Sequence, residues 1–463
     1  MAARLWKFLA ISLEGEFEMS EPRYFDRHTE SLSRAELDKL QLERLRAMLV
    51  HVSETNEFYR SRWDEAGVDV EKIQSFEDFR KYVPTVEKSD FLNDQLNFPP
   101  FGKRMASSAA GRERVEIYTT SGTSGQGVEV HMQSMRELAV MEKLYGFYLT
   151  WAGLQSGDST MLTLPITMLA GGRAEYQGAV GHGLTTYPIG NYASQQKVDL
   201  IKRFKPKSLF GSTSYLAHLA TQLGEDAKRC GVEVLLTGLE GVGPSFFERL
   251  QDQWGAPAAD RFGCAQMRAD FMFTDERGVG NAQNPGVLVN ADPFVYLEVL
   301  DVNTGLPVAD GEFGELVVTS LYHFDNPVIR NRLKDGGIFR KGSIGGAKRQ
   351  FNGVQVGSIT RIDDVKKIKG INVYPQAVDD VMYSLPEVEQ YEVILSSTAD
   401  YTDQALLNIQ CRNSVGAIPP ESGVRIRSIL KERLGINFDI AFVTSIEVSD
   451  YKARRWKDLR TRD

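Results

Sequence analysis

Cysteine and long apolar runs are scarce in this sequence of 463 residues. The three cysteines, Cys230, Cys264 and Cys411, lie far apart and form no C-x-x-C pair. Their spacing excludes a disulfide framework and a structural zinc site and favours a reducing, cytoplasmic setting. No stretch approaches the roughly eighteen uninterrupted apolar residues of a membrane span, and Lys7 interrupts the apolar start, so we expect no signal peptide.

Positive charge is also in short supply, because the formal net charge is −8. That sign excludes a protein that wraps a nucleic-acid backbone. The hydrophobic content of 42% is ordinary for a chain that folds around a core. The length exceeds what one core normally serves, so we expect a large domain and at least one smaller one. We interpret residues 1–18 as a surface extension.

The order of local patterns predicts an α/β protein. Ser33 and Glu36 form a capping box before an amphipathic helix. In the middle of the chain, apolar runs such as MLTLP and EVLLTGL alternate with helical stretches, which is typical of a largely parallel sheet covered by helices. Residues 293–320 change to hairpin patterns, and the segment from about Asp364 reads helix, strand, strand, helix, strand. The last hundred or so residues would therefore form a small α+β domain.

A loop rich in glycine and hydroxyl groups, TTSGTSGQG at residues 119–127, lies between two strand patterns. Its backbone N–H groups and hydroxyls suit a polyphosphate, and the absence of G-x-x-x-x-G-K-[ST] excludes a Walker loop. The alternative is a flexible hairpin. The residues expected to bind phosphate are Thr120, Ser121, Gly122, Thr123, Ser124 and Gly125.

Five segments resemble one family in the right order. YTTSGTSGQG resembles the phosphate loop of the adenylate-forming (acyl-CoA synthetase) superfamily. Four further segments are similar to its phenylacetate–CoA ligase branch: EFYRSRWDEAGVDVEKIQSFEDF, NPVIRNRLKD, TRIDDVKKIKGINVYPQAVDD and DYKARRWKDLR. The resemblance implies a large N-terminal domain at 1–362, with helix-covered sheets, and a small, mobile α+β lid at 363–463 that turns about Asp363.

The resemblance also assigns nucleotide-binding roles. Asp335 matches the aspartate that accepts hydrogen bonds from both ribose hydroxyls, and one carboxylate has the two oxygens that a vicinal diol needs. Arg361 matches an arginine near the ribose or phosphates. Taken alone, Asp335 would be a turn residue before two glycines, and Asp363 a solvated turn residue. The adenine site is expected to include Gly238, Phe262 and Gly263.

Lys452 matches the late lysine that bridges the substrate carboxylate and the α-phosphate, so it is the expected catalytic residue. It belongs to a basic end in which Arg454, Arg455 and Lys457 would also face phosphates. The alternative is a solvated C-terminal face, which we prefer for Lys457, Arg460 and Arg462. Lys369 and Gly370 resemble a loop that reaches the site during thioester formation. The acyl pocket is expected to contain Gly171, Gly172, Tyr215 and Gly241.

Two positions depart from the family pattern. Gln126 stands where a lysine is usual, and Gln266 where a glutamate ordinarily helps hold Mg²⁺, an ion that prefers carboxylate oxygen and water. Gln266 keeps a carbonyl ligand for the metal but loses the charge. Cys264 has no histidine or carboxylate at a readable spacing, so we interpret it as a small buried filler.

The leading hypothesis is an AMP-forming ligase that activates a carboxylic acid, expected to be aromatic or otherwise unsaturated, with ATP and Mg²⁺, and then transfers the acyl group to CoA. Transfer to an amine or to a carrier-protein thiol is a close alternative. The rival is a repurposed protein that binds a nucleotide or acyl-adenylate with little or no adenylation, because Gln126 and Gln266 replace charged groups. We expect a monomer or homodimer in either case.

Overall fold

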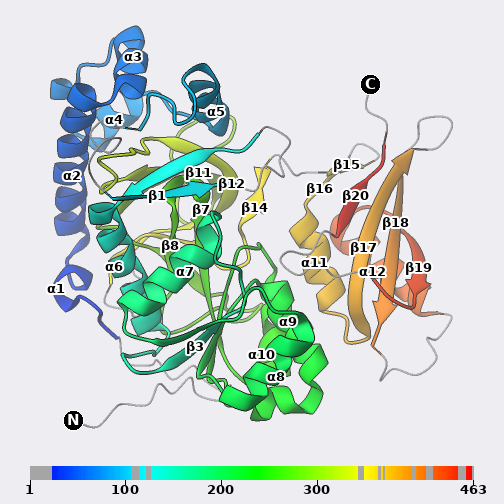
Figure 1. Ribbon diagram of the computed structural model, residues 1–463. Coiled ribbons are helices and arrows are strands. Elements are labelled where there is room, and N and C mark those ends of the chain that lie inside the picture. Colours follow the sequence, from blue (N-terminus) through cyan, green and yellow to red (C-terminus); the bar gives the residue numbers. More distant parts are fainter. Residues whose placement is uncertain are drawn as a thin grey trace.

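The computed structural model describes residues 23–105, 114–120, 127–342, 349–362, 366–368, 371–397, 403–412, 421–446 and 455–460. A large body carries the N-terminal part of the chain, and a smaller body carries the C-terminal part (Figure 1). No helix in the described ranges combines the length and the apolar character needed to cross a bilayer.

A layer of helices covers the edge of the large body that lies opposite the small body (Figure 1). The predicted capping box is present, since the Ser33 and Glu36 side chains each bond the other residue's backbone N–H. Leu45, Met48 and Leu49 anchor the longest helix in a core cluster. The elements of this layer are α1 (Arg27–Glu30), α2 (Arg34–Thr55), α3 (Glu57–Ala66), η1 (Val70–Lys72), α4 (Phe76–Tyr82) and α5 (Lys88–Asn97).

A sheet of 12 strands runs through the large body. Its strands are β3 (Ser159–Leu162), β4 (Thr185–Pro188), β5 (Ser208–Phe210), β6 (Val234–Gly238), β7 (Ala258–Cys264), β8 (Ala269–Thr274), β9 (Val287–Asn290), β10 (Val295–Leu300), β11 (Phe313–Ser320), β12 (Asn331–Arg340), β13 (Gly353–Gln355) and β14 (Thr360–Arg361). The order is β10-β11-β12-β13-β9-β8-β7-β6-β5-β3-β4, and β14 pairs with β12. Within this sheet, the five neighbouring strands β4, β3, β5, β6 and β7 are parallel. In the other half, neighbouring strands are antiparallel and several are joined by hairpins. The expectation of a largely parallel sheet therefore holds for one half.

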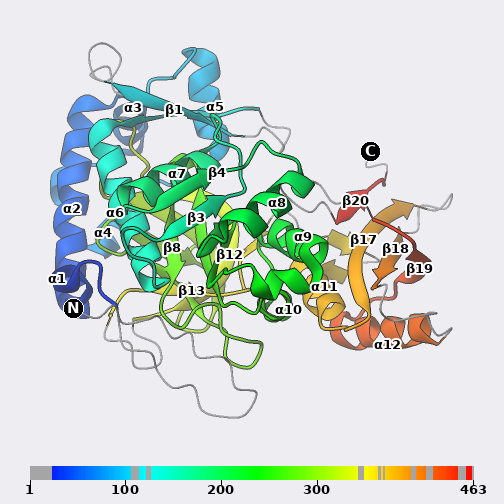
Figure 2. The same cartoon turned by 60° about the horizontal axis from the view of Figure 1, so that its bottom comes forward.

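Helices pack on both sides of the parallel half, as the alternating pattern predicts (Figure 2). They are α6 (Met135–Trp151), α7 (Ala170–Gly181), α8 (Ser194–Phe204), α9 (Thr213–Leu223), η2 (Gly224–Arg229) and α10 (Pro244–Trp254). A separate hairpin of β1 (Val115–Thr119) and β2 (Val130–Ser134) flanks the predicted phosphate loop. The hairpin is tied to α5, because the Gln95 side chain accepts a hydrogen bond from the Val130 backbone N–H at 3.1 Å.

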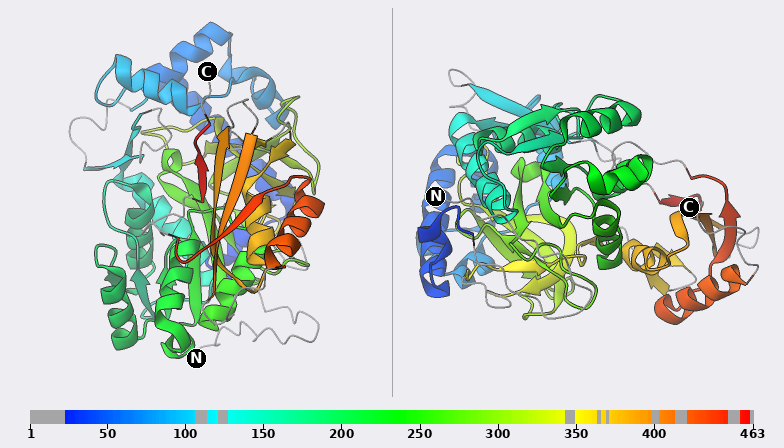
Figure 3. Two further views of the ribbon diagram at one scale, coloured as in Figure 1. Left: turned by 90° about the vertical axis from the view of Figure 1, so that its right-hand side faces the viewer. Right: turned by 90° about the horizontal axis from the view of Figure 1, so that it is seen from below.

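The small body contains the α+β elements that the sequence predicts, and it projects from one side of the large body (Figure 3). Its elements are β15 (Lys366–Ile368), β16 (Ile371–Val373), α11 (Pro375–Tyr383), β17 (Val388–Ser397), β18 (Asp403–Cys411), α12 (Ser422–Leu434), β19 (Asp439–Val443) and β20 (Trp456–Asp458). Four strands form a sheet in the order β19-β18-β17-β20. Phe246 of α10 meets Tyr383 of α11 edge to face, with ring centroids 4.5 Å apart. The predicted helix-covered α/β fold with a small α+β body is confirmed. The boundary at Asp363 stays a prediction, because residues 363–365 lie outside the described ranges.

Candidate functional site

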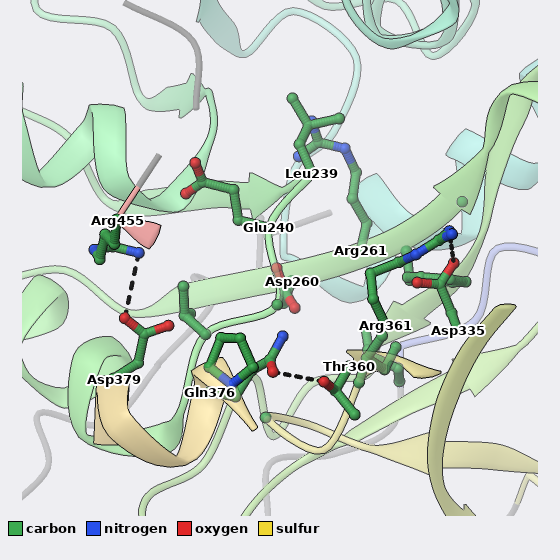
Figure 4. Close-up of a pocket in the computed structure, with 18 of the residues that line it drawn as sticks. Leu239, Glu240, Asp260, Arg261, Asp335, Thr360, Arg361, Gln376, Asp379 and Arg455 are labelled. Atoms are coloured by element: carbon green, nitrogen blue, oxygen red, sulfur yellow. Dashed lines mark hydrogen bonds and ion pairs between the residues drawn. The ribbon is translucent and has the colours of Figure 1, made fainter. Parts of the chain in front are cut away.

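A cleft of about 510 Å³ lies between the two bodies (Figure 4). The large body contributes the ends of β6 and β7 and the segment around β14, and the small body contributes α11 and β20. Ligands of open α/β sheets bind beyond the carboxyl ends of the strands, which is where β6 and β7 meet this cleft. The cleft is therefore the candidate site.

Asp335 and Arg361 lie side by side in the cleft wall. Strands β12 and β14 pair so that these two residues are cross-strand partners, and Arg361 Nη1 lies 3.7 Å from Asp335 Oδ2. The same guanidinium nitrogen donates to the Leu333 carbonyl at 3.1 Å. Lys334 precedes the aspartate with a φ of 60°, in the left-handed region that costs energy for a side chain. The structure thus brings together two residues that the sequence analysis assigned to one nucleotide.

Gly241, after β6, and Gly263, within β7, are required as glycines because other segments of the chain approach their backbone closely. A Cβ on Gly241 would lie 2.5 Å from the Ile359 carbonyl oxygen, and one on Gly263 would lie 2.3 Å from that of Ala269. Gly241, Phe262 and Gly263 all line the cleft, and Gly238 ends β6 directly before Leu239, which also lines it. Their predicted binding roles remain predictions, but their location is consistent with them.

A cluster of largely buried charged residues forms part of the cleft lining. Asp260 accepts a hydrogen bond from the Thr237 hydroxyl at 2.8 Å, and burial raises the pKa of Asp260 to about 7. Arg261 Nε donates to Asp270 Oδ2 at 3.0 Å, and its Nη2 pairs with Glu175 of α7. Burial also raises the pKa of Glu175 to about 7. The sequence analysis missed this cluster, although its signal was present as an Asp-Arg pair inside the apolar strand AADRFGC.

The residues assigned to the acyl pocket separate into three environments. A Cβ on Gly171 would meet Leu239 and Leu164 at ordinary contact distances of 3.5 and 3.8 Å. A Cβ on Gly172 would lie 2.4 Å from the Pro165 carbonyl oxygen, so this glycine serves close packing of the chain. Tyr215 is buried, its hydroxyl is 3.0 Å from Ser194 Oγ, and it does not line the cleft. Gly241 is thus the member that lines the cleft itself, and Gly171 lies beside Leu239, which also lines it.

The small body supplies further cleft residues that the sequence analysis did not single out. The Thr360 hydroxyl donates to Gln376 Oε1 at 2.5 Å, which links β14 to α11. Arg455, from the basic end, lines the cleft and lies 3.4 Å from Asp379 (Figure 4). Its guanidinium also lies over the Tyr383 ring. Burial raises the pKa of Asp379, and Arg455 opposes that effect. Lys457 points elsewhere and pairs with Glu392 at 2.6 Å.

Gln266 and Cys264 lie at the end of β7. Gln266 Nε2 is 3.0 Å from each carboxylate oxygen of Glu129. Burial raises the pKa of Cys264 to about 12, which is consistent with its interpretation as a filler without nucleophilic character. In the described ranges no group of three or more His, Cys, Asp or Glu residues is placed to hold a metal ion.

Several predicted site residues lie outside the described ranges. Thr120 is the described member of the phosphate loop, and its hydroxyl accepts the Glu129 backbone N–H at 2.9 Å. Those outside are Ser121, Gly122, Thr123, Ser124, Gly125, Gln126, Asp363, Lys369, Gly370, Lys452 and Arg454, together with the extension at 1–18.

Comparison with known proteins agrees with the resemblance read from the motifs. The chain matches the AMP-binding enzyme family over residues 34–324 and the C-terminal domain of AMP-binding enzymes over residues 370–460. It is 27% identical to the phenylacetate–coenzyme A ligase of Escherichia coli K12 over 443 residues, which cover 93% of this chain and 97% of that one.

Solved structures of a 2-hydroxyisobutyryl-CoA ligase share the fold at 24% identity. Its postadenylation structure with 2-HIB-AMP superimposes with a TM-score of 0.85 over 98% of this chain and 96% of that one. Its thioesterification structure, with 2-HIB-AMP and CoA, reaches 0.68 over 96% and 94%. The arrangement of the two bodies described above is thus closer to the first of these states. With its large and small bodies both matched, the chain belongs to the AMP-binding enzyme family.

Proposed function

We propose that this chain activates a carboxylic acid with ATP as an acyl-adenylate and then transfers the acyl group to CoA. The Asp335 and Arg361 pair at the mouth of the interdomain cleft is the observation that carries the proposal. Full-length similarity to a phenylacetate–coenzyme A ligase favours CoA over an amine or a carrier-protein thiol as the acceptor. Because ATP and CoA are cytoplasmic metabolites, the same proposal places the enzyme in the cytoplasm.

Nucleotide binding divides between the two walls of the cleft. The Asp335 carboxylate offers two acceptor oxygens for the ribose diol, and Arg361 beside it offers a cation for ribose or phosphate oxygens. Phe262 and Gly263 line the cleft, and Gly238 directly precedes Leu239 in its wall. These three residues would border the space for the adenine ring. Thr120 and the loop residues after it would receive the phosphates.

The acid would lie next to Gly171 and Leu239. Leu239 is 40% exposed and adopts a φ of 70° at the cleft. Ile166, Met168 and Leu169, just before α7, are also exposed apolar side chains. Of these side chains, Leu239 lines the cleft. An apolar side chain there favours an apolar acid over a strongly polar one, and similarity to a phenylacetate–coenzyme A ligase favours an aromatic or otherwise unsaturated acid.

In the first step, a carboxylate oxygen of the acid attacks the α-phosphorus of ATP and the bond to the bridging oxygen of pyrophosphate breaks. Lys452 is the proposed cation at that transition state, where an oriented positive charge stabilises the developing negative charge. In the second step, the CoA sulfur attacks the acyl carbon, AMP leaves, and the thiol proton passes to solvent. Closure of the cleft by the small body would exclude water from the adenylate.

Mg²⁺ would enter with ATP and neutralise phosphate charge. Magnesium in nucleotide sites is held by one or two protein oxygens together with phosphates and water. Gln266, whose Nε2 faces Glu129, offers its carbonyl oxygen Oε1 as one such protein oxygen, so this residue fits the ion.

The test is product analysis with purified protein, ATP, Mg²⁺, CoA and a panel of aryl, unsaturated and short aliphatic acids. Mass spectrometry should find an acyl-CoA and equimolar AMP, with aryl or unsaturated acids preferred. The matched negative control is Asp335→Ala. Nucleotide binding without any product from the whole panel would favour the repurposed binding protein instead.

A further inference from the structure

Gln266 and Glu129 come from segments that are far apart in the sequence and meet beside the β1–β2 hairpin that flanks the predicted phosphate loop. Glu129 directly precedes β2, and Gln266 lies in the one-turn helix η3 (Ala265–Met267) that follows β7. Gln266 Nε2 is 3.0 Å from both Glu129 oxygens. The amide and the carboxylate therefore form a dyad that joins the hairpin to the end of a cleft strand.

Glu129 is held rigidly at the base of the phosphate loop. Its backbone N–H donates to the Thr120 hydroxyl at 2.9 Å, and its carbonyl accepts the Thr120 N–H at 3.1 Å. Its side chain is fully buried. Lys88 Nζ lies 3.7 Å from Oε2. The protein therefore encloses this carboxylate, with a cation and an amide beside it.

His131 and Arg104 complete the surroundings of this carboxylate. His131 Nε2 is 3.7 Å from Glu129 Oε1, but burial and the Arg104 guanidinium hold the pKa of His131 well below its usual range. The imidazole is therefore neutral near pH 7. Burial raises the pKa of Glu129, and Gln266, Lys88 and Arg104 oppose that effect.

The dyad fixes which end of the Gln266 amide faces outward. The Nε2 end of Gln266 lies 3.0 Å from both Glu129 oxygens, so the NH₂ group faces Glu129 and the carbonyl oxygen Oε1 points away from it. Within the described ranges no group donates to Oε1, and Gln266 is half-buried whereas Glu129 is fully buried. The oxygen is the end of the side chain left for a ligand.

We propose that Glu129 is a positioning residue that presents Gln266 Oε1 as an oxygen ligand to the Mg²⁺ of bound ATP. This inference rests on the proposed function. Glu129 then lies one hydrogen bond behind the ligand and holds the amide in the orientation that presents Oε1. Groups that orient a metal ligand in this way typically change metal affinity by about 10-fold to 100-fold when they are altered.

The test measures nucleotide binding as a function of Mg²⁺, by calorimetry with a non-hydrolysable ATP analogue and no acid present. Glu129→Gln should raise the Mg²⁺ concentration for half-saturation by about tenfold or more, while binding of the analogue in EDTA stays unchanged. Gln266→Leu, which removes the oxygen itself, should do the same. Glu116→Gln is the matched control, since Glu116 is a buried carboxylate of the same hairpin that bonds Tyr118 and Gln177.

The reversed pair gives the sharpest outcome. Gln266→Glu alone places two carboxylates in contact and should weaken Mg²⁺-dependent binding of the analogue. The double variant E129Q/Q266E restores a donor and an acceptor, so it should return the Mg²⁺ concentration for half-saturation to the wild-type value or below. Electron paramagnetic resonance of Mn²⁺ with the analogue should report the same order. The proposal is overturned if Glu129→Gln leaves half-saturation within twofold of wild type, or if every variant changes binding equally in EDTA. Wild-type protein that binds the metal and analogue normally but forms no acyl-adenylate would instead contradict only the proposed function.

Discussion

Arg249 of the large body makes several polar contacts with the small body. From α10, its Nη1 donates to the Val388 carbonyl at 2.9 Å and its Nη2 to the Glu389 carbonyl at 3.1 Å. Nη2 is also 3.5 Å from Glu389 Oε1, and the guanidinium lies over the Tyr383 ring. Arg249→Met keeps the apolar stem of the side chain but removes all of these polar contacts.

The expected cost follows from the number of charged hydrogen bonds. Each hydrogen bond from a charged donor contributes about 1.5–3 kcal/mol, and water at the edge of the interface recovers part of that loss at the two carbonyls. In Arg249→Met, we expect the observed arrangement of the two bodies to be destabilised by about 3 kcal/mol relative to other arrangements of the same bodies. This corresponds to a roughly 150-fold change in the ratio of their populations.

Double electron–electron resonance between spin labels introduced by Asp252→Cys in α10 and Glu432→Cys in α12 would measure that ratio. Both positions are exposed, and the native cysteines would be replaced in the labelled protein. The wild type should give one main distance and Arg249→Met a second population of comparable or larger size. Arg203→Met, on the exposed face of α8, is the control. An Arg249→Met distribution identical to that of the control would refute the reasoning.

Three further outcomes follow from the cleft. Asp335→Asn removes a charged acceptor and should raise the dissociation constant for ATP by about 10-fold to 100-fold in calorimetry, and an unchanged constant would remove Asp335 from the ribose site. Burial raises the pKa of Asp260 to about 7, so the folded state binds the carboxyl proton more tightly than the unfolded state does. The contribution of Asp260 to the free energy of unfolding therefore falls as pH rises from about 4 to 7 and is level above pH 7. Asp260→Asn should therefore gain about 3 kcal/mol over the wild type between pH 5 and pH 8, seen as a widening gap in thermal midpoints; a constant gap would contradict the assignment. Gly171→Val fills the space beside Leu239 and should lower kcat/KM for aryl acids at least about tenfold more than for acetate, whereas equal losses would place the acyl pocket elsewhere.

Local patterns predicted much of the fold because the forces that form single elements are local. The capping box at Ser33 and Glu36 and the helices and strands of the small body each depend on residues a few positions apart. The mixed direction of the large sheet was harder to predict, because strand order depends on contacts between distant segments. Gly172 shows the same limit. It was expected in the acyl pocket, but it lies in a close-packed helix, with the Pro165 carbonyl where a side chain would be.

Site residues that belong to a recognisable motif were predicted from the sequence, whereas contacts between side chains from distant segments were missed. Asp335 and Arg361 were named from two short motifs, and strand pairing places them together. The pairing of Gln266 with Glu129 joins residues separated by 137 positions. Nothing in either local sequence indicates that partner, because side-chain hydrogen bonds across a fold leave no periodic pattern.

Acid-dependent exchange of labelled pyrophosphate into ATP tests the central claim most directly, because it reports adenylate formation without CoA. With wild-type protein, Mg²⁺ and an aryl acid, exchange should rise well above the acid-free rate, and Lys452→Ala should lower it severely while ATP still binds. Absence of acid-dependent exchange across aryl, unsaturated and aliphatic acids, in protein that binds ATP, would contradict the account.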